Sequence, residues 1–201
     1  MTKRARRAAL LPVAFFARSA AEVARDLLGQ VLVVEGAAGR IVETESYLGG
    51  EDPASHAAGL RRTGRNAAIY GPPGTWYVYL SYGMHWCANL VAGPPGQGAA
   101  VLLRALEPLE GLELMGRRRG TTIPRLLCAG PGRLCQALGI DRTLDGRPMR
   151  RSVARVLGGD GVPDRRVRVT PRIGITKAAD WPLRFLEAGS SWVSGPRGSN
   201  D

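Results

Sequence analysis

The sequence predicts an α+β fold, a single domain with a mostly antiparallel sheet and peripheral helices. The chain has 201 residues, of which 44% are hydrophobic, so it can bury one substantial core. Strand-like runs follow one another with only short turns rich in glycine and proline between them, which is typical of antiparallel pairing. Helix signals are confined to a few short segments between these runs.

The strands are predicted from runs rich in β-branched, aromatic and aliphatic residues that are bounded by turn signals. Residues 35–39 should turn the first strand into the second and so form a hairpin. Tyr77 and Tyr79 should share one face of their strand, because alternate residues of a strand point the same way. The predicted strands cover residues 30–34, 40–48, 75–82, 85–91, 99–104, 153–157 and 167–169, and the runs 184–186 and 191–193 close the domain.

Four helices are predicted from capping and turn chemistry. Ser19 and Glu22 form a capping box at the start of the first helix. Asp52 and Pro53 suit the N-cap and the first helical position, so a short helix should carry His56. The predicted helices run from residue 19 to 28, from 52 onward, from 107 to about 115, and from the glycine-rich stretch 128–134 to about 139.

Charge is the strongest global signal in the composition. Lys and Arg total 28 and Asp and Glu total 17, giving a net charge of +11, which favours an anionic partner such as nucleic acid. Residues 1–14 are expected to form a basic N-terminal arm, and residues 15–201 the folded domain. A secretory signal is the alternative for the opening residues, but Pro12 interrupts its apolar run and Arg18 stands where a small-residue cleavage site should begin. The sequence has no apolar stretch of 18 residues, so no transmembrane helix is expected.

The cysteines and histidines do not predict a metal site. Cys87, Cys128 and Cys135 have neither a paired nor a metal-binding spacing, and the only histidines are His56 and His85. An odd, small number of cysteines suits a reducing compartment. We therefore expect neither a metal nor an organic cofactor.

The strand-like run 41–47 combines two carboxylates and a phenol. A period of two places Ile41, Glu43, Glu45 and Tyr47 on one face of that strand. Buried carboxylates are costly unless they are paired or used in chemistry. Taken alone, a solvated strand face is the more common explanation, so other parts of the chain must decide.

Four runs resemble the alkyladenine (3-methyladenine) DNA glycosylase family of the mammalian type, in the order of that family. They are RIVETESYLGGEDPASHAA, TWYVYLSYGMHWCANLV, VLLRALEPLEG and LLCAGPGRLCQALGI, and the resemblance extends over residues 15–193 of what looks like a bacterial member. It implies a curved, open-barrel-like sheet. It also implies a DNA repair glycosylase that flips alkylated or deaminated purines out of duplex DNA and hydrolyses the N-glycosidic bond, which initiates base excision repair.

The resemblance assigns the chemistry to Glu45 and Arg104. Glu45 would be the general base that deprotonates the attacking water, and its charge would stabilise an oxocarbenium-like transition state. Arg104 matches the family arginine near that water. Glu43 would support the structure or position Arg104 rather than act as a second catalyst.

The same resemblance assigns a base pocket to five side chains. Tyr47 and Tyr79 would sandwich the extruded base, and His56 would meet its edge, oriented by Tyr77. Asn89 would disfavour undamaged guanine by crowding its exocyclic amine. Each residue has an ordinary explanation by itself, since tyrosines in strands usually pack and lone histidines usually lie on the surface. Their joint occurrence with Glu45 favours the pocket.

DNA contacts are implied at the hairpin and at nearby basic positions. Tyr82 matches the side chain that intercalates between base pairs, with Met84 beside it, although an ordinary hairpin aromatic would look the same. Phosphate contacts are individually weaker assignments, because they position a protein and are easily replaced. The candidates are Arg61, Arg65, Gly130, Gly132, Arg133 and Lys177.

Several features distinguish this chain from mammalian members. Ile69 stands where the mammalian protein has a methionine and His85 where it has an aromatic residue, so base preference is left open among 3-methyladenine, 7-methylguanine, hypoxanthine and ethenoadenine. The long mammalian N-terminal tail is also expected to be missing. Lyase activity would need an amine nucleophile, and the only lysines are Lys3 and Lys177. We predict a monofunctional, water-using DNA-3-methyladenine glycosylase.

Two other functions fit parts of the sequence. A noncatalytic nucleic-acid-binding module would share the basic surface and the aromatic pocket. A carbohydrate hydrolase could use Glu43 and Glu45, which lie ~6.5–7 Å apart along an extended strand, close to the spacing of an inverting pair. The preferred interpretation is an enzyme that acts on damaged double-stranded DNA as a monomer, without a membrane, in the cytoplasm with the nucleoid.

Overall fold

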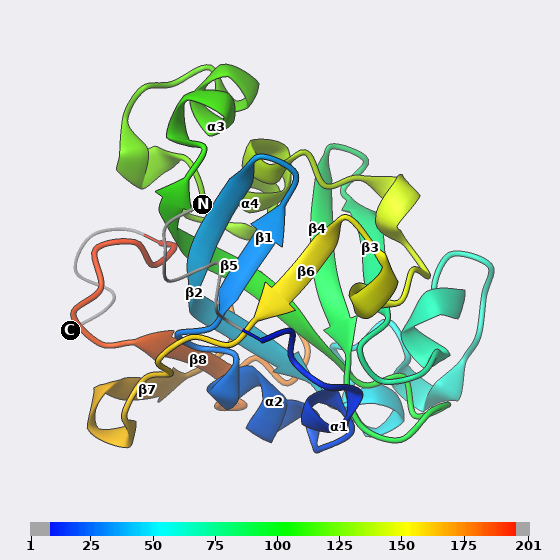
Figure 1. Cartoon of the computed structure of the whole chain (residues 1–201). Helices are drawn as coiled ribbons and strands as arrows, with labels where there is room; N and C mark the ends of the chain where they lie inside the picture. Colours follow the sequence, from blue (N-terminus) through cyan, green and yellow to red (C-terminus); the bar gives the residue numbers. More distant parts are fainter. Residues whose placement is uncertain (1–8, 196–201) are drawn as a thin grey trace.

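The computed structural model describes residues 9–195, which form a curled sheet surrounded by short helices (Figure 1). All pairings between the named strands of this part of the chain are antiparallel, as predicted. The strands are β1 (Val31–Val34), β2 (Ala37–Tyr47), β3 (Trp76–Ser81), β4 (His85–Val91), β5 (Ala100–Glu110), β6 (Ala154–Leu157), β7 (Val167–Thr170) and β8 (Arg184–Glu187).

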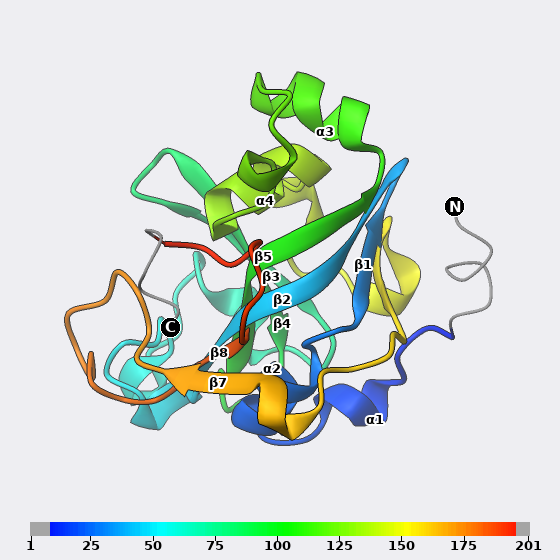
Figure 2. The ribbon, with the colours of Figure 1, turned by 90° about the vertical axis from the view of Figure 1, so that its left-hand side faces the viewer.

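Strand β2 lies at the centre of this sheet. The strand order is β3-β4-β5-β2-β1-β6, and β8 pairs with both β2 and β7. β5 pairs with β2 along most of its length, while β1 and then β8 pair with the early and later residues of β2. The two views show the sheet curling like an open half-barrel (Figures 1 and 2), which confirms the predicted α+β architecture.

Short helices cover the sheet. α2 packs against β2, α4 packs against β4, and α3 packs against α4. The predicted capping box of α2 is present, with the Ser19 hydroxyl accepting from the Glu22 amide and the Glu22 carboxylate accepting from the Ser19 amide. The α-helices are α1 (Val13–Phe16), α2 (Ala20–Asp26), α3 (Leu112–Arg119) and α4 (Pro131–Leu138). The 3₁₀ helices cover Gly49–Glu51, Ala58–Leu60, Ala67–Tyr70, Pro124–Leu126, Arg142–Leu144, Met149–Arg151 and Asp164–Arg166.

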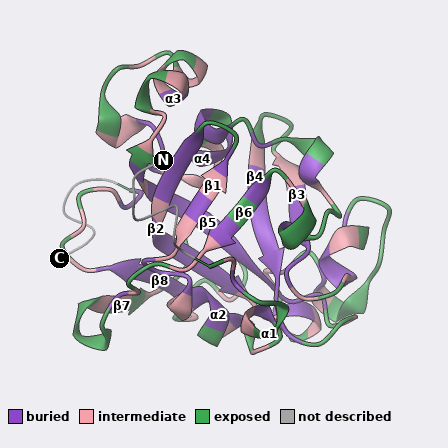
Figure 3. Cartoon of the chain, viewed as in Figure 1, coloured by how far each residue is buried: buried purple, intermediate pink, exposed green. Residues whose placement is uncertain are grey.

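The alternation of side chains along β3 separates the main core from a second cluster. Trp76 and Val78 belong to the main core with α2 and α4. Tyr77 and Tyr79 lie on the opposite face, where they pack with Ile69. Buried residues run along the central strands (Figure 3), so the sheet has a packed face and a second face on which a site can form.

The pairing of β2 is irregular, and this corrects two expectations. The first hairpin turns at residues 35–36 and β2 already begins at Ala37. Ile41 does not share a face with the glutamates but lies in the main core, whereas Val42 packs against Leu186 on the other side. Register shifts with β5 on both sides of Glu43 break the period of two at this point.

Two predicted helices were wrong. His56 lies in a turn, because the Asp52 carboxylate accepts the amide proton of Ala54 and closes an Asx turn instead of a helix.

The helix predicted from residue 107 begins later in the structure. Residues 107–110 continue β5, and α3 starts only after Gly111. Pro108 is tolerated in β5 because the register with β2 shifts there, at a bulge. Gly111 has φ +76°, and a Cβ at that position would lie 2.3 Å from the carbonyl oxygen of Gly36.

The ends of the domain are held by backbone pairing and burial. Residues 1–8 of the predicted N-terminal arm lie outside the described residues; Leu10 forms a bridge with Leu157, and Phe16 is fully buried. Cys87, Cys128 and Cys135 are buried and free. Within residues 9–195, no helix is both long enough and apolar enough to cross a membrane.

Candidate active site

A cavity of about 620 Å³ opens on the face of the sheet that lies opposite the main core. Its size is ordinary for a small-molecule site. The side chains that line it come from strands β2, β3, β4 and β5, from the β3–β4 turn, from the turns around residues 55 and 65, from the 3₁₀ helix Ala67–Tyr70, from the start of α4 and from the loop at residues 173–175. They include Tyr47, His56, Arg65, Ile69, Tyr77, Tyr79, Tyr82, Asn89, Leu102, Arg104 and Ile173.

Aromatic rings form one wall of the cavity. The rings of Tyr77 and Tyr79 lie 5.4 Å apart between centroids, and those of His56 and Tyr79 lie 4.4 Å apart. Burial raises the pKa of Tyr47, Tyr77 and Tyr79 far above the usual value for a phenol, so all three hydroxyls stay protonated. This wall therefore offers flat π faces and hydroxyl donors without negative charge.

His56 lies at the edge of this wall, in contact with Tyr77. Its Nδ1 is 2.7 Å from the Tyr77 hydroxyl oxygen. Desolvation of the ring and the positive charge of Arg65 lower the pKa of His56 below 6.5, so it is neutral at pH 7. Since the Tyr77 phenol keeps its proton, it can donate to Nδ1, which leaves the His56 proton on Nε2.

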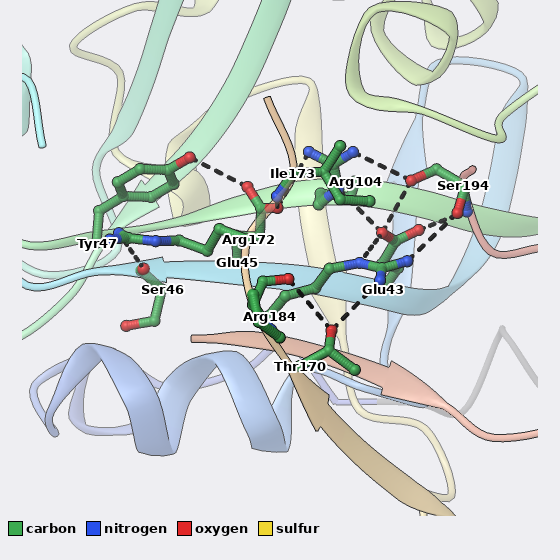
Figure 4. Close-up of polar contacts among 11 residues, drawn as sticks. Glu43, Glu45, Ser46, Tyr47, Arg104, Thr170, Arg172, Ile173, Arg184 and Ser194 are labelled. Atoms are coloured by element: carbon green, nitrogen blue, oxygen red, sulfur yellow. Dashed lines mark hydrogen bonds and ion pairs between the residues drawn. The ribbon is translucent and has the colours of Figure 1, made fainter. Parts of the chain in front are cut away.

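Glu45 is fully buried, and its carboxylate lies between the Tyr47 hydroxyl and Arg104 (Figure 4). Its Oε1 accepts from the Ile173 amide at 2.8 Å and lies 3.2 Å from Nη1 of Arg104. Its Oε2 accepts from the Tyr47 hydroxyl at 3.1 Å. A carboxylate oxygen has two lone pairs, so Oε2 can still accept a proton or a hydrogen bond from a water molecule.

Glu43 is held by the buried groups around it and does not line the cavity. Its carboxylate accepts from Nε of Arg104 at 2.9 Å, from Nε of Arg184 at 2.7 Å, and from the amide and hydroxyl of Ser194 at 2.6 and 2.8 Å. These four donors occupy the carboxylate. Glu43 therefore positions Arg104 and anchors the segment that follows β8.

Arg104 connects the two glutamates. Burial alone would lower the pKa of its guanidinium, but the charges of Glu45 and Glu43 raise that pKa above the ordinary value. The side chain therefore keeps a positive charge at the inner end of the cavity. Its Nη2 also donates to the Ser194 hydroxyl at 3.1 Å.

Asn89 and Ile69 complete the inner surface. The Asn89 amide nitrogen donates to the carbonyl oxygen of Tyr77 at 3.0 Å, which holds the side chain against the floor of the cavity. Ile69 is 2% exposed, so it lines the inner part of the cavity and not its opening.

The β3–β4 hairpin stands out from the surface beside the cavity. Tyr82 is 84% exposed and Met84 is 70% exposed. Tyr82 has φ +50° and Gly83 has φ +69°, and the Met84 amide donates to the carbonyl oxygen of Ser81 at 3.0 Å. A tyrosine in this left-handed region is strained.

The basic residues predicted for phosphate contacts surround the cavity on several sides. Arg65 lines it, and Arg61 lines an adjoining hollow with Arg65. Gly130, Gly132 and Arg133 line a second hollow beyond the hairpin, together with Tyr82 and His85. Lys177 is exposed in the loop that follows Ile175. Gly132 has a packing role as well, because a Cβ there would lie 2.9 Å from Cβ of His85.

Sequence reasoning missed five residues that hold the site together. They are Asp52, Arg172, Ile173, Arg184 and Ser194. The side chains of Asp52 and Arg172 form a buried ion pair, and the other three contact Glu45 or Glu43. Four of the five lie in chain segments more than 100 residues from β2, in irregular stretches or in the short strand β8, and no local pattern marks them.

Among the described residues, no group of three or more His, Cys, Asp and Glu side chains is placed to hold a metal ion. A buried carboxylate beside an arginine can activate water, and the aromatic wall can hold a flat ring.

Residues 14–191 match the sequence profile of a family described as methylpurine-DNA glycosylase. Three similar proteins carry the name "Putative 3-methyladenine DNA glycosylase". That of Rhodopseudomonas palustris is 51% identical over 90% of this chain and 89% of its own length, and that of Rhizobium meliloti is 51% identical over 90% and 95%. That of Methanoculleus marisnigri is 50% identical over 92% and 98%. The chain belongs to the methylpurine-DNA glycosylase family of DNA repair enzymes.

Proposed function

We propose that this DNA repair glycosylase takes a damaged purine out of duplex DNA into the cavity and hydrolyses its bond to the sugar with water activated by Glu45. The observation that carries the proposal is the contact of the buried Glu45 carboxylate with Arg104 and Tyr47, two side chains that line the aromatic cavity. A base in a duplex is stacked on both faces, so the nucleotide must leave the helix to reach this depth.

The aromatic wall supports recognition of a methylated purine. Tyr47 and Tyr79 hold the base by stacking, and each stacking contact is worth about 1–3 kcal/mol. N-methylation gives a purine a positive charge, which the π faces of the tyrosines attract. Neutral His56 carries no positive charge that would repel a cationic base, and its Nε2 can donate a hydrogen bond to the edge of the base. Asn89 crowds the exocyclic amine of an undamaged guanine.

The hydrolysis forms a bond from water oxygen to C1′, breaks the bond from C1′ to the base, and transfers one proton from the water. Water bound beside Arg104 attacks C1′ of the sugar, Glu45 accepts a proton from that water, and the bond from C1′ to the base breaks with its electron pair going to the base. A cationic methylpurine leaves as a neutral base, so it needs no acid. The Glu45 carboxylate also offsets the positive charge that develops on the sugar.

The exposed groups suit the DNA around the extruded nucleotide. Tyr82 and Met84 are placed to fill the vacated space in the stack. Arg61, Arg65, Arg133 and Lys177, with the backbone at Gly130 and Gly132, are placed to contact phosphates. The lesion named for the similar proteins, 3-methyladenine, is the first substrate to test.

The enzyme works as a monomer on damaged double-stranded DNA of the nucleoid, in the cytoplasm. This proposal is supported by the fact that one chain supplies every residue assigned to the site. Sedimentation of the protein as one 21.5 kDa copy, alone and on a lesion duplex, is the expected result, and a dimer in both states would contradict it.

Glu45→Gln tests the central step. Removal of a general base should slow release of 3-methyladenine or 7-methylguanine from a duplex by about 10²–10⁴-fold, while affinity for the same duplex persists. Glu107→Gln is the matched control, because Glu107 is a half-buried glutamate on β5 that pairs with Arg40 away from the cavity. Base release by the Glu45→Gln protein at the unmodified rate would contradict the proposal.

The two alternative functions drawn from the sequence are not favoured. A noncatalytic module does not account for membership in a family of glycosylases. A carbohydrate hydrolase would need Glu43 as the partner of Glu45, but Glu43 is held by Arg104, Arg184 and Ser194, whereas Oε2 of Glu45 contacts the cavity-lining Tyr47.

A further inference from the structure

A buried ion pair lies behind the cavity without lining it. Nη1 and Nη2 of Arg172 lie 2.5 and 2.9 Å from the two carboxylate oxygens of Asp52, and both side chains are 0% exposed. The residues are 120 positions apart in the sequence. This bidentate geometry fixes the orientation of both groups.

Arg172 connects the pair to Tyr47 and Glu45. Its guanidinium carbon lies 4.7 Å from the ring centroid of Tyr47, and Nη1 also donates to the carbonyl oxygen of Ser46 at 3.1 Å. The next residue, Ile173, donates its amide proton to Glu45 at 2.8 Å. In Figure 4, Arg172 extends along the Tyr47 ring while Ile173 lies at Glu45.

Asp52 connects the same pair to the segment that carries His56. Its carboxylate accepts the amide protons of Leu48 at 3.2 Å and Ala54 at 3.0 Å. The cavity is lined by Ala54 and by the two residues that follow it. One carboxylate therefore orders both the end of β2 and the turn that presents His56.

The loop that contains Ile173 has little other support. Residues 171–183, between β7 and β8, form no helix or strand. The position of the Ile173 amide therefore depends on the anchoring of the neighbouring Arg172 side chain. A buried ion pair contributes weakly to stability, because desolvation offsets its attraction, so its main contribution here is geometric.

We propose that Asp52 and Arg172 are positioning residues that hold Glu45, Tyr47 and the His56 turn at the spacing required for hydrolysis. The inference rests on the proposed role of Glu45. Neither residue touches the base or the water; each acts through a group that does.

The test compares Arg172→Lys and Asp52→Asn with the unmodified protein. Arg172→Lys keeps the positive charge but loses the planar fork, and Asp52→Asn keeps the side-chain size but loses the charge. Single-turnover release of hypoxanthine should slow by about 10- to 100-fold, as expected when reacting groups shift by roughly 1 Å. The Kd for the lesion duplex should change much less, because Tyr82 and the basic residues are untouched.

Arg40→Lys is the matched control. Arg40 lies near the start of β2 and pairs with Glu107 at 2.7 Å and Glu187 at 2.6 Å, so the change breaks an arginine fork on the same strand but away from the cavity. It should leave the rate unchanged. The inference would be overturned if all three variants released the base at the rate of the unmodified protein. It would also be overturned if each loss of rate matched the fraction of that variant that is unfolded.

A second measurement separates this inference from the proposed function. Fluorescence of ethenoadenine in a duplex reports how the extruded base stacks in the cavity, and it needs no chemistry. Arg172→Lys should change this signal because the Tyr47 ring loses its support, whereas Glu45→Gln should leave it close to that of the unmodified protein. An Arg172→Lys signal identical to the unmodified one overturns the positioning role at Tyr47. A Glu45→Gln protein with full activity overturns the proposed base instead.

Discussion

At the scale of single residues, the site depends on where protons are held. Buried tyrosines keep their protons, and His56 is kept neutral by desolvation and by Arg65. A positively charged purine therefore meets π faces and a neutral imidazole rather than an imidazolium. Arg104, which also lines the cavity, lies beside the carboxylates that compensate its charge.

His56 should make both stability and activity depend on pH. Its pKa is lowered in the fold from 6.5, so the unfolded chain takes up the proton first as the pH falls. The contribution of His56 to the free energy of unfolding is therefore complete above 6.5 and declines as the pH falls through the lowered pKa. Release of a cationic lesion should decline in the same range, because protonated His56 would repel it.

Urea unfolding of the unmodified protein and of His56→Gln at pH 7.5 and pH 5.5 measures this effect. The free energy of unfolding of the unmodified protein should exceed that of His56→Gln by less at pH 5.5 than at pH 7.5. His85→Gln is the matched control, because His85 is exposed on the hairpin and outside the main cavity. An advantage that grows toward pH 5.5 would contradict the assignment.

At the scale of elements, the β3–β4 hairpin combines strain with exposure. Tyr82 takes a left-handed backbone conformation that favours Gly or Asn, yet its ring is 84% exposed and gains little from packing. Such strain is commonly retained at functional positions. The hairpin therefore loses stability while it exposes an aromatic ring, as the proposed intercalation requires.

Tyr82→Asn should separate these two effects. Asn accepts the left-handed conformation, so the free energy of unfolding should rise by about 1 kcal/mol, while the rate of base release falls because no ring fills the vacated stack. Denaturant unfolding and single-turnover kinetics measure the two quantities. Leu60→Asn is the control, since Leu60 has φ +57° and is 57% exposed; it should gain stability and keep its rate. A Tyr82→Asn protein that is both less stable and fully active would contradict this account.

Regular elements could be predicted from the sequence, and irregular ones could not. The alternation on β3 placed Tyr77 and Tyr79 on one face, and the capping box placed the start of α2, because these signals are local. A β-bulge changes which residues share a face, and the local sequence pattern does not indicate where it occurs. Pro108 looked like a helix start but lies in a strand where the register shifts, and Ile41 left its expected face for the same reason.

At the scale of the whole molecule, the family resemblance named most of the candidate site, and adjacent strands bring the named side chains together. Glu45, Tyr47, Tyr79, Asn89 and Arg104 meet through strand pairing between neighbours in the sheet. The supports arrive from distant loops, as Arg172 does from 120 residues away. These supporting residues come together only in the folded chain, so their spacing in the sequence does not predict their contacts.

The net charge of +11 should appear in the salt dependence of DNA binding. Each phosphate contact removed should reduce the slope of log K against log salt by about 1, so Arg61→Gln and Arg133→Gln should each do so. Arg155→Gln is the control, because this exposed arginine lies on β6, at the other end of the strand order from β3. Titration of a lesion duplex at several salt concentrations gives the slopes, and equal slopes for all three variants would contradict the proposed contact surface.

The burial of the three cysteines has a consequence for an enzyme that repairs chemical damage. The reagents that methylate purines also attack protein thiolates, and the thiolate rather than the thiol is the reactive form. Burial raises the pKa of Cys128 to about 12 and also raises those of Cys87 and Cys135. Very little thiolate is therefore present at neutral pH, so these three cysteines should react slowly with the electrophiles that create the substrates.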